Sequence, residues 1–224
     1  MVELILGLDE AGRGPVIGPM VLAGCLIEKS DESALRRLGV KDSKMVTPKR
    51  REFLENEIKK IAKTFELVIC EAIEIDRKNS DGTNLTELEA EKMASIINKI
   101  NDGNEKLKII IDCPSIGINS WTNTLKIKIR NLSNVEFVIE HKADKNHVSV
   151  SAASILAKCE RERGMGKLKE IYGDEIGSGY CTDPLTIKFL EKFALKFEAD
   201  GLFRKSWSTW RDAREKLVQA ELEF

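Results

Sequence analysis

Four acidic residues stand where they could act together. Asp9 and Glu10 end an aliphatic segment near the N-terminus, and Asp112 and Asp144 each follow another aliphatic segment. If these segments are strands of one α/β sheet, their ends gather at one edge, where ligands usually bind. Carboxylates that are taken out of water repel one another, so such a cluster needs protons or cations to neutralise it.

The ligand chemistry of this cluster favours one class of ion. Oxygen ligands suit Mg²⁺ or Mn²⁺, and the chain lacks the His-rich or Cys-rich groups that are typical of zinc sites. Two such ions about 4 Å apart promote phosphoryl transfer, because one activates water and the other stabilises the leaving oxygen. The alternative is that each acid only caps a helix or a turn.

A glycine-rich turn follows the first two acids. Gly12, Gly14 and Gly18 have the spacing G-x-G-x-x-x-G, and two prolines stand where a dinucleotide-binding motif would continue as a helix. The turn would instead let backbone N–H groups approach a sugar-phosphate, with Arg13 as a side-chain donor. A plain tight turn is the alternative on these residues alone.

An α/β framework is expected to position these residues. Aliphatic segments predict strands at 4–8, 20–27, 65–75, 107–111 and 135–139. Helical periodicity predicts helices at 48–63, 85–100, 148–159, 185–197 and 206–222. Alternation of the two indicates an α/β layer in which 107–111 is central and the first two strands form a hairpin. We expect a catalytic domain at 1–165 and C-terminal loops and helices at 166–224, within one compact unit.

Composition excludes several classes of protein. The 224 residues are 42% hydrophobic and 33% charged, so the chain is neither disordered nor membranous. The longest apolar stretch, 20–27, is too short to span a bilayer, and the N-terminus has no basic flank typical of a secretory signal. We expect a monomeric, cytoplasmic protein without a membrane contact. Five widely spaced cysteines without a C-x-x-C pair argue against disulfides and structural zinc.

Nucleic-acid affinity must come from local patches, because 36 Lys and Arg residues nearly balance 37 Asp and Glu residues. The candidates for phosphate contacts are Lys44, Lys142, Lys158, Arg204 and Lys205. The last two belong to a basic segment, 201–217, whose tryptophans are more often core residues than base-stacking ones. Ser154, which lies four residues before Lys158 on one helical face, is a further candidate substrate contact, and we expect His147 to start that helix.

The motifs of the chain resemble those of ribonuclease HII (type 2 ribonuclease H), in a version of archaeal length. The matching segments are Leu8-Asp9-Glu10-Ala11-Gly12-Arg13-Gly14, Lys41-Asp42-Ser43-Lys44, Ile110-Ile111-Asp112, Lys142-Ala143-Asp144, Ser151-Ala152-Ala153-Ser154-Ile155-Leu156-Ala157-Lys158, Gly177-Ser178-Gly179-Tyr180 and Lys205-Ser206-Trp207. They run in the order of the family and cover nearly the whole chain. One departure is at His147, where the family often has a Tyr-Pro pair.

The resemblance implies both a fold and an activity. The fold is a ribonuclease-H-like mixed β-sheet flanked by helices, with a helical C-terminal subdomain that helps to hold the substrate. The activity is endonucleolytic cleavage of the RNA strand in RNA–DNA hybrids, and at single ribonucleotides embedded in duplex DNA. The products carry 3′-hydroxyl and 5′-phosphate ends.

The resemblance also assigns roles to residues. The metal-binding acids of the family, which hold Mg²⁺ or Mn²⁺, correspond to Asp9, Glu10, Asp112 and Asp144. Gly12, Arg13 and Gly14 match the motif that contacts the 2′-hydroxyl and the flanking phosphate. Tyr180 matches the tyrosine that packs on the sugar and helps to sense the junction between ribose and deoxyribose; a tyrosine that seals its loop onto the core is the alternative. Reading the 2′-hydroxyl distinguishes RNA from DNA without reading the base.

Two other functions are open at this stage. A catalytically idle module would bind hybrid without turnover, and a nuclease of the same fold acting on DNA junctions would cut all-DNA substrates. The sequence leaves open the preferred ion, the acid that bridges the ions, a contact with a sliding clamp, the role of Lys41 to Lys44, and any part that His141 or His147 takes in turnover.

Overall fold

The computed structural model describes residues 2–41 and 46–222, so Lys44 and most of its motif lie outside the described residues. The chain divides into two compact units. The sheet unit comprises Met1–Ala11, Val21–Val68 and Leu85–Glu160, and the helical unit comprises Gly12–Met20, Ile69–Asn84 and Arg161–Phe224. The C-terminal segment of the helical unit starts at Arg161, near the expected boundary at 165. The unit also includes Gly12–Met20 and Ile69–Asn84, which the sequence analysis assigned to the catalytic domain.

A mixed five-stranded sheet forms the centre of the sheet unit, in the order β3-β2-β1-β4-β5. The strands are β1 (Leu4–Ala11), β2 (Met20–Glu28), β3 (Thr64–Cys70), β4 (Leu107–Asp112) and β5 (Val135–Glu140). β1 pairs antiparallel with β2 and parallel with β4, which pairs parallel with β5. The mixed sheet confirms the expected fold class, although β1 and not β4 is the middle strand.

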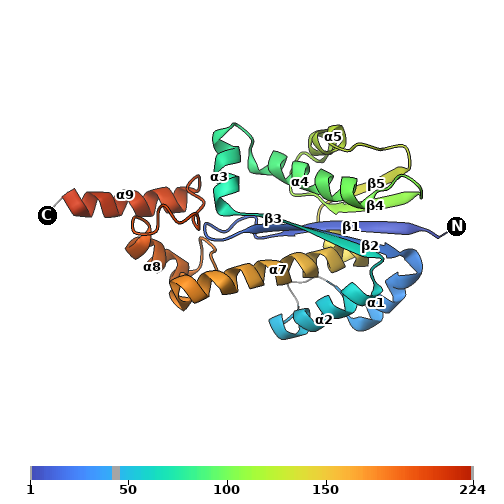
Figure 1. The fold of residues 1–224 in the computed structure, drawn as a ribbon, viewed down its shortest axis with the longest axis horizontal. Coiled ribbons are helices and arrows are strands. Elements are labelled where there is room, and N and C mark those ends of the chain that lie inside the picture. The colour runs from blue at the N-terminus through green and yellow to red at the C-terminus, as the bar shows by residue number, and fades with distance from the viewer. Residues whose placement is uncertain (1, 42–45, 223–224) are drawn as a thin grey trace. The chain divides into compact units, whose positions relative to one another are not determined.

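Parallel pairing brings the carboxyl ends of three strands to one edge of this sheet. Leu8 of β1 stands opposite Ile111 of β4, and Asp112 stands opposite Glu140 of β5. Figure 1 shows β1, β4 and β5 running side by side. The acids that close β1 and β4 therefore lie at the same edge, as the strand-end argument predicts.

Helices cover both faces of the sheet (Figure 1). α4 (Leu85–Ile100) and α5 (Ile118–Ile127) lie on one side, and α1 (Glu32–Leu38), α2 (Pro48–Ile61) and the start of α7 (Val148–Tyr172) lie on the other. A short 3₁₀ turn (Lys29–Asp31) precedes α1, and α6 (Ala143–Asn146) precedes α7. Thr47 caps α2, because its side chain accepts a hydrogen bond from the Arg50 N–H.

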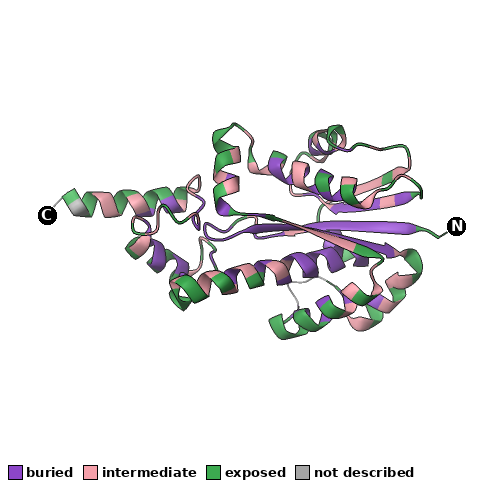
Figure 2. Cartoon of the chain, viewed as in Figure 1, coloured by how far each residue is buried: buried purple, intermediate pink, exposed green. Residues whose placement is uncertain are grey.

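Close packing of β1 on α7 fixes the middle of the sheet. A Cβ added at Gly7 would lie 2.2 Å from the backbone carbon of Ser149, so only glycine fits there. Ser149, Ala152 and Ala153 are buried at the start of α7, where their small side chains permit close contact between helix and sheet. β1 and β2 are buried along almost their whole length, as Figure 2 shows.

Several element boundaries differ from the sequence prediction. The strand expected at 65–75 ends at Cys70, and α3 (Ala72–Ser80) follows it. α7 continues to Tyr172 through two glycines, whereas the prediction ended it at Cys159. Phe53 falls on the apolar stripe of the helix predicted at 48–63, but it is exposed, and the Arg50 guanidinium lies 4.6 Å from the centre of its ring. Sequence periodicity reports only local preferences, so it does not predict boundaries and exposures that depend on contacts between distant residues.

The helical unit has its own apolar core. α3, the end of α7, a 3₁₀ turn (Asp174–Ile176), α8 (Pro184–Phe193) and α9 (Ser208–Leu222) make up its regular structure. Ile17, Phe189, Phe203 and Trp210 are buried together. Trp210 is thus a core residue, as its spacing favoured, and α8 and α9 confirm the expected C-terminal helices.

Two broader expectations have structural counterparts. The five cysteines, all of which the structure describes, form no disulfide. Within the described ranges no helix combines the length and the apolar character that crossing a bilayer requires.

Candidate active site

Three carboxylates meet at the carboxyl edge of the sheet. Asp9 of β1, Asp112 of β4 and Asp144 of α6 each place a carboxylate oxygen within 4.8 Å of the others. Asp9 and Asp144 are buried, and Asp112 is half-buried. Because these donors are all oxygen atoms, the set fits a hard divalent cation such as Mg²⁺ or Mn²⁺ and does not fit zinc.

Asp9 is under electrostatic strain in this cluster. Desolvation by burial is the main cause that raises its pKa from 3.8 to about 7. The carboxylates of Asp112 and Asp144 raise the pKa further, whereas hydrogen bonds with Ser154 and with the Glu10 N–H lower it. The protein therefore holds a carboxylate where its negative charge is unfavourable unless a proton or a cation balances it.

Asp112 is oriented by the backbone of the segment after β5. The Lys142 N–H donates to Asp112 Oδ1 over 2.7 Å. Lys142 has a φ of 60°, in the left-handed region, which turns its N–H toward the end of β4. A backbone donor thus fixes one carboxylate oxygen of Asp112.

Asp144 is held by the start of α7. Ser151 Oγ donates to the Asp144 carbonyl over 2.5 Å and lies 3.2 Å from the carbonyl of His147. His147 directly precedes α7, as expected, and its Nε2 lies 3.3 Å from a Glu140 carboxylate oxygen.

Glu10, the fourth expected acid, is not in the cluster of three. Successive residues of a strand point to opposite faces, so the side chains of Asp9 and Glu10 leave β1 in different directions. Glu10 and Asp112 both raise the pKa of the Cys113 thiol, for which desolvation is the main cause. Glu10 is thus near the end of β4, on the side of Cys113.

The other expected site residues of the sheet unit lie around this edge. Ser154 is buried on α7 and bonds Asp9, so it supports a carboxylate. Lys158, one helical turn further, is half-buried, and Lys142 is exposed.

In the helical unit, the Gly12–Gly14 loop rests on a buried arginine. Arg204 has no exposed surface, and its guanidinium donates to the carbonyls of Gly12 and Arg13 over 2.6 and 2.7 Å. The sequence analysis expected Arg204 to contact a phosphate directly. That expectation is corrected, because a guanidinium buried against backbone carbonyls does not face a ligand. Lys205 is half-buried, and its N–H donates to Asp76 over 2.7 Å.

Tyr180 belongs to the same unit and is tied to the same loop. It is 43% exposed, which leaves its ring accessible and does not fit a tyrosine sealed in the core. The preceding Gly179 carbonyl accepts from the N–H groups of Val16 and Ile17, over 2.9 and 3.2 Å. The Arg161 guanidinium carbon lies 5.0 Å from the centre of the Tyr180 ring and so braces its inner side.

Sequence reasoning missed Arg161, which is buried and also donates to the Ser178 carbonyl over 3.0 Å. A Cβ added at Gly12 would lie 2.4 Å from the Arg161 side chain. The helix predicted from the sequence ends at Cys159, two residues before Arg161, so no sequence pattern singled Arg161 out.

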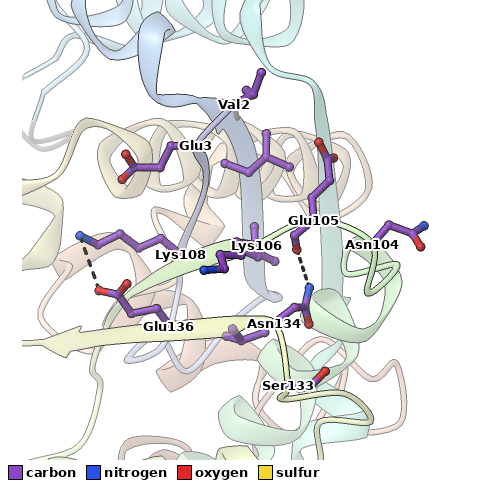
Figure 3. A pocket seen from close by; sticks show the side chains of 12 residues that line it. Val2, Glu3, Asn104, Glu105, Lys106, Lys108, Ser133, Asn134 and Glu136 are labelled. Carbon is purple, nitrogen blue, oxygen red and sulfur yellow. Dashed lines mark hydrogen bonds and ion pairs between the residues drawn. The ribbon is translucent and has the colours of Figure 1, made fainter.

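A cavity of about 750 Å³ lies at the other end of the sheet (Figure 3). It is lined by the first residues of β1, β4 and β5, including Leu4, Leu107 and Val135. Asp112 follows Leu107 by five residues, roughly 17 Å along an extended strand. Lys108 and Glu136 of its lining form an ion pair at 4.0 Å. The cavity is therefore separate from the carboxylate cluster.

Comparison with known proteins agrees with this geometry. The family model for ribonuclease HII matches residues 6–210. The chain belongs to the ribonuclease HII family. A ribonuclease HII of Methanocaldococcus jannaschii is 42% identical over 229 residues, covering 98% of both chains.

Solved structures of ribonuclease HII share the fold. The ribonuclease H2 of Pyrococcus horikoshii superposes with a TM-score of 0.84 at 36% identity, covering 95% of this chain and 98% of its own. A structure of the PCNA:RNase HII complex from Archaeoglobus fulgidus superposes with a TM-score of 0.79 at 36% identity. The match covers 92% of this chain and 95% of that chain. Ribonuclease HII enzymes are hydrolases of the ribonuclease H type, and membership implies activity on RNA–DNA hybrids.

We predict that Asp9→Asn stabilises the protein in the presence of a chelator. A raised pKa means that the folded state binds a proton more tightly than the unfolded state between pH 4 and about 7. Wild-type stability in EDTA should therefore fall as pH rises through this window, by up to about 4 kcal/mol, and the amide should remove that loss. Thermal unfolding of both proteins in EDTA at pH 5 and pH 8 measures this loss of stability.

Glu136→Gln is the matched control, because it removes one negative charge from an exposed side chain. It should leave the pH dependence of wild type unchanged. An Asp9→Asn protein that is no more stable than wild type at pH 8 in EDTA would contradict the electrostatic strain assigned to Asp9.

Proposed function

We propose that this chain cleaves the RNA strand of RNA–DNA hybrids and single ribonucleotides in duplex DNA by two-metal-ion hydrolysis. The products would carry 3′-hydroxyl and 5′-phosphate ends. The observation that carries the proposal is the meeting of Asp9, Asp112 and Asp144 within 4.8 Å. An all-oxygen cluster of this kind suits phosphoryl transfer, and family membership supports ribonucleotide-containing substrates.

The acids have distinct tasks in this proposal. Asp9, Asp112 and Asp144 would hold Mg²⁺ or Mn²⁺, and Glu10, which lies near the end of β4 on the side of Cys113, would be the fourth ligand. The bound ions would activate the attacking water and stabilise the leaving 3′-oxygen. The Ser154 hydrogen bond favours the ionised form of Asp9, and the Lys142 N–H fixes the orientation of Asp112. Both contacts prepare carboxylate oxygens for the ions before substrate arrives.

The helical unit supplies the recognition of ribose. Gly12, Arg13 and Gly14 would contact the 2′-hydroxyl and the flanking phosphate, and the exposed face of Tyr180 would pack on the sugar. Lys142, Lys158 and Lys205 are proposed phosphate contacts, and Lys44 stays a prediction from the sequence. None of these groups reads a base, so cleavage should not depend on sequence.

The first test is cleavage of a labelled DNA duplex that contains one ribonucleotide, with and without Mg²⁺ or Mn²⁺. Wild type should make a single metal-dependent cut on the 5′ side of the ribonucleotide and leave an all-DNA duplex intact. Asp112→Asn should fold normally, since its oxygen can still accept from Lys142, and lose about a hundredfold or more of the rate.

The outcomes separate the alternatives. Glu136→Gln is again the matched control and should cleave like wild type. Full activity of Asp112→Asn would overturn its assignment as a metal ligand. Cleavage of the all-DNA duplex would favour a junction nuclease, and binding without any cleavage would favour an idle hybrid-binding module.

Tyr180 should matter most at isolated ribonucleotides. Tyr180→Ala removes the ring that would pack on the sugar, so we expect a loss of about tenfold at a single ribonucleotide and a smaller loss within a long RNA stretch. Tyr180→Phe keeps the ring and serves as the control. Equal losses on both substrates, measured as kcat/KM, would remove the junction-sensing role.

A contact with PCNA is the remaining part of the proposal. The solved complex of the Archaeoglobus relative supports it, and Leu222 presents 81% of its surface near the end of α9. Co-elution of the chain with an archaeal PCNA in gel filtration tests it. Leu222→Ala should weaken that co-elution, and a complex that forms equally well would exclude Leu222 from the contact.

A further inference from the structure

Arg204 is the most completely buried charged residue of the helical unit and the centre of a set of carbonyl acceptors. Its guanidinium donates to Gly12, Arg13 and Gly18 carbonyl oxygens, with distances between 2.6 and 3.2 Å. The Gly14 carbonyl accepts from Trp207 Nε1 over 3.0 Å. Three successive carbonyls of the loop, those of residues 12 to 14, thus face side-chain donors.

The direction of these carbonyls decides the direction of the amides. In a trans peptide the C=O and the N–H point opposite ways, and the described peptide bonds are trans. The Gly12 carbonyl shares its peptide with the Arg13 N–H, and the Arg13 carbonyl shares its peptide with the Gly14 N–H. Both N–H groups therefore point away from Arg204. The Gly14 N–H meets no acceptor among the residues that the structure describes, and Gly14 is exposed.

The charge on Arg204 is not neutralised by an ion pair. Neither Arg204 nor the neighbouring Arg161 forms a salt bridge within the described part of the chain. Burial, followed by the repulsion from Arg161, lowers the pKa of Arg204 to about 10, so the guanidinium remains charged at neutral pH. Asp76 is the nearby acid, but it accepts from the N–H groups of Lys205 and Ser206. The positive charges of Arg204 and Arg161 are therefore buried beneath the Gly12–Gly14 loop.

The geometry points to Arg204 as a positioning residue that sets the polarity of the Gly12–Gly14 loop. By drawing the carbonyls inward, it turns the Arg13 and Gly14 amides outward and presents the Gly14 N–H as a preformed donor for a phosphate or hydroxyl oxygen. This inference rests on the proposed function of the loop in ribose and phosphate recognition. It goes beyond that function because it assigns the orientation of the loop to a residue that touches no substrate.

Lysine cannot replace arginine in this role. The acceptors surround a planar group that donates from three nitrogen atoms, Nε, Nη1 and Nη2. A lysine keeps the charge but offers its donors from one atom, so it cannot reach all of these carbonyls in the same geometry. Arg204→Lys consequently separates the shape of the group from its charge.

The experiment compares wild type, Arg204→Lys and Phe189→Leu. Phe189 lies in the same apolar core and makes no polar contact with the loop, so its variant matches a loss of stability alone. Backbone amide signals of Arg13 and Gly14 are followed by NMR without substrate. KM and kcat are then measured on the single-ribonucleotide duplex, with the all-DNA duplex as a competitive inhibitor.

Arg204→Lys should shift the amide signals of residues 13 and 14 and raise KM at least tenfold, with kcat changing less than threefold. The ratio of KM to the inhibition constant of the all-DNA duplex should rise at least fivefold. Phe189→Leu should leave these signals and ratios as in wild type. Unchanged amide signals in Arg204→Lys, or a loss in kcat alone, would overturn the inference.

A second measurement needs no variant and covers the case in which Arg204→Lys does not fold. Inorganic phosphate titrated into wild type should shift the amide signals of residues 13 and 14, and silent signals would overturn the inference. The NMR arms also separate this inference from the proposed function. A wild type that cleaves no substrate overturns the proposed function, whereas the loop polarity is decided by the amide signals.

Discussion

Mutual repulsion among buried carboxylates is the constraint on which the rest of this structure depends. Asp9, Asp112 and Asp144 come together at a cost that burial increases, as the raised pKa of Asp9 indicates. A soft framework would relax by moving these groups apart. The framework is instead rigid, because parallel pairing fixes β1 against β4 and the absence of a side chain at Gly7 seats β1 directly on α7. Under the proposed function, a bound divalent cation would offset the free-energy cost of this arrangement.

The two units orient their functional groups in opposite ways. In the sheet unit, backbone and hydroxyl donors orient acidic groups, whereas in the helical unit a buried cation orients backbone groups. Arg204 binds carbonyls, Arg161 contacts both the Ser178 carbonyl and the Tyr180 ring, and Gly179 bonds the segment after Gly14. Under the proposed function, the surfaces that meet substrate are main-chain amides and the exposed ring of Tyr180, which suit an enzyme that reads the backbone of a nucleic acid.

The acidic residues of the site could be predicted from the sequence, whereas the residues that hold the recognition loop in place could not. Asp112 could be placed because a buried strand ends there, and pairing of parallel strands brings such ends together. The role of Arg204 could not be predicted, since its acceptors lie 186 to 192 residues away along the chain. Asp76, 129 residues before Lys205, was invisible for the same reason. Phe53 was misplaced by the helical periodicity. It stands at an apolar position of the helical repeat, yet it is exposed to solvent and contacts the Arg50 guanidinium.

Lys142 illustrates how such a site behaves under mutation. Its contribution to Asp112 comes from the main chain, in a left-handed conformation that glycine and asparagine adopt easily and β-branched residues resist. The position is consequently constrained by backbone shape rather than by side-chain chemistry. Drift toward glycine or asparagine would preserve the metal-facing geometry, whereas proline or valine would abolish it without altering one acidic residue. A comparison of homologues that counts only the carboxylates would therefore overlook inactive members of the family.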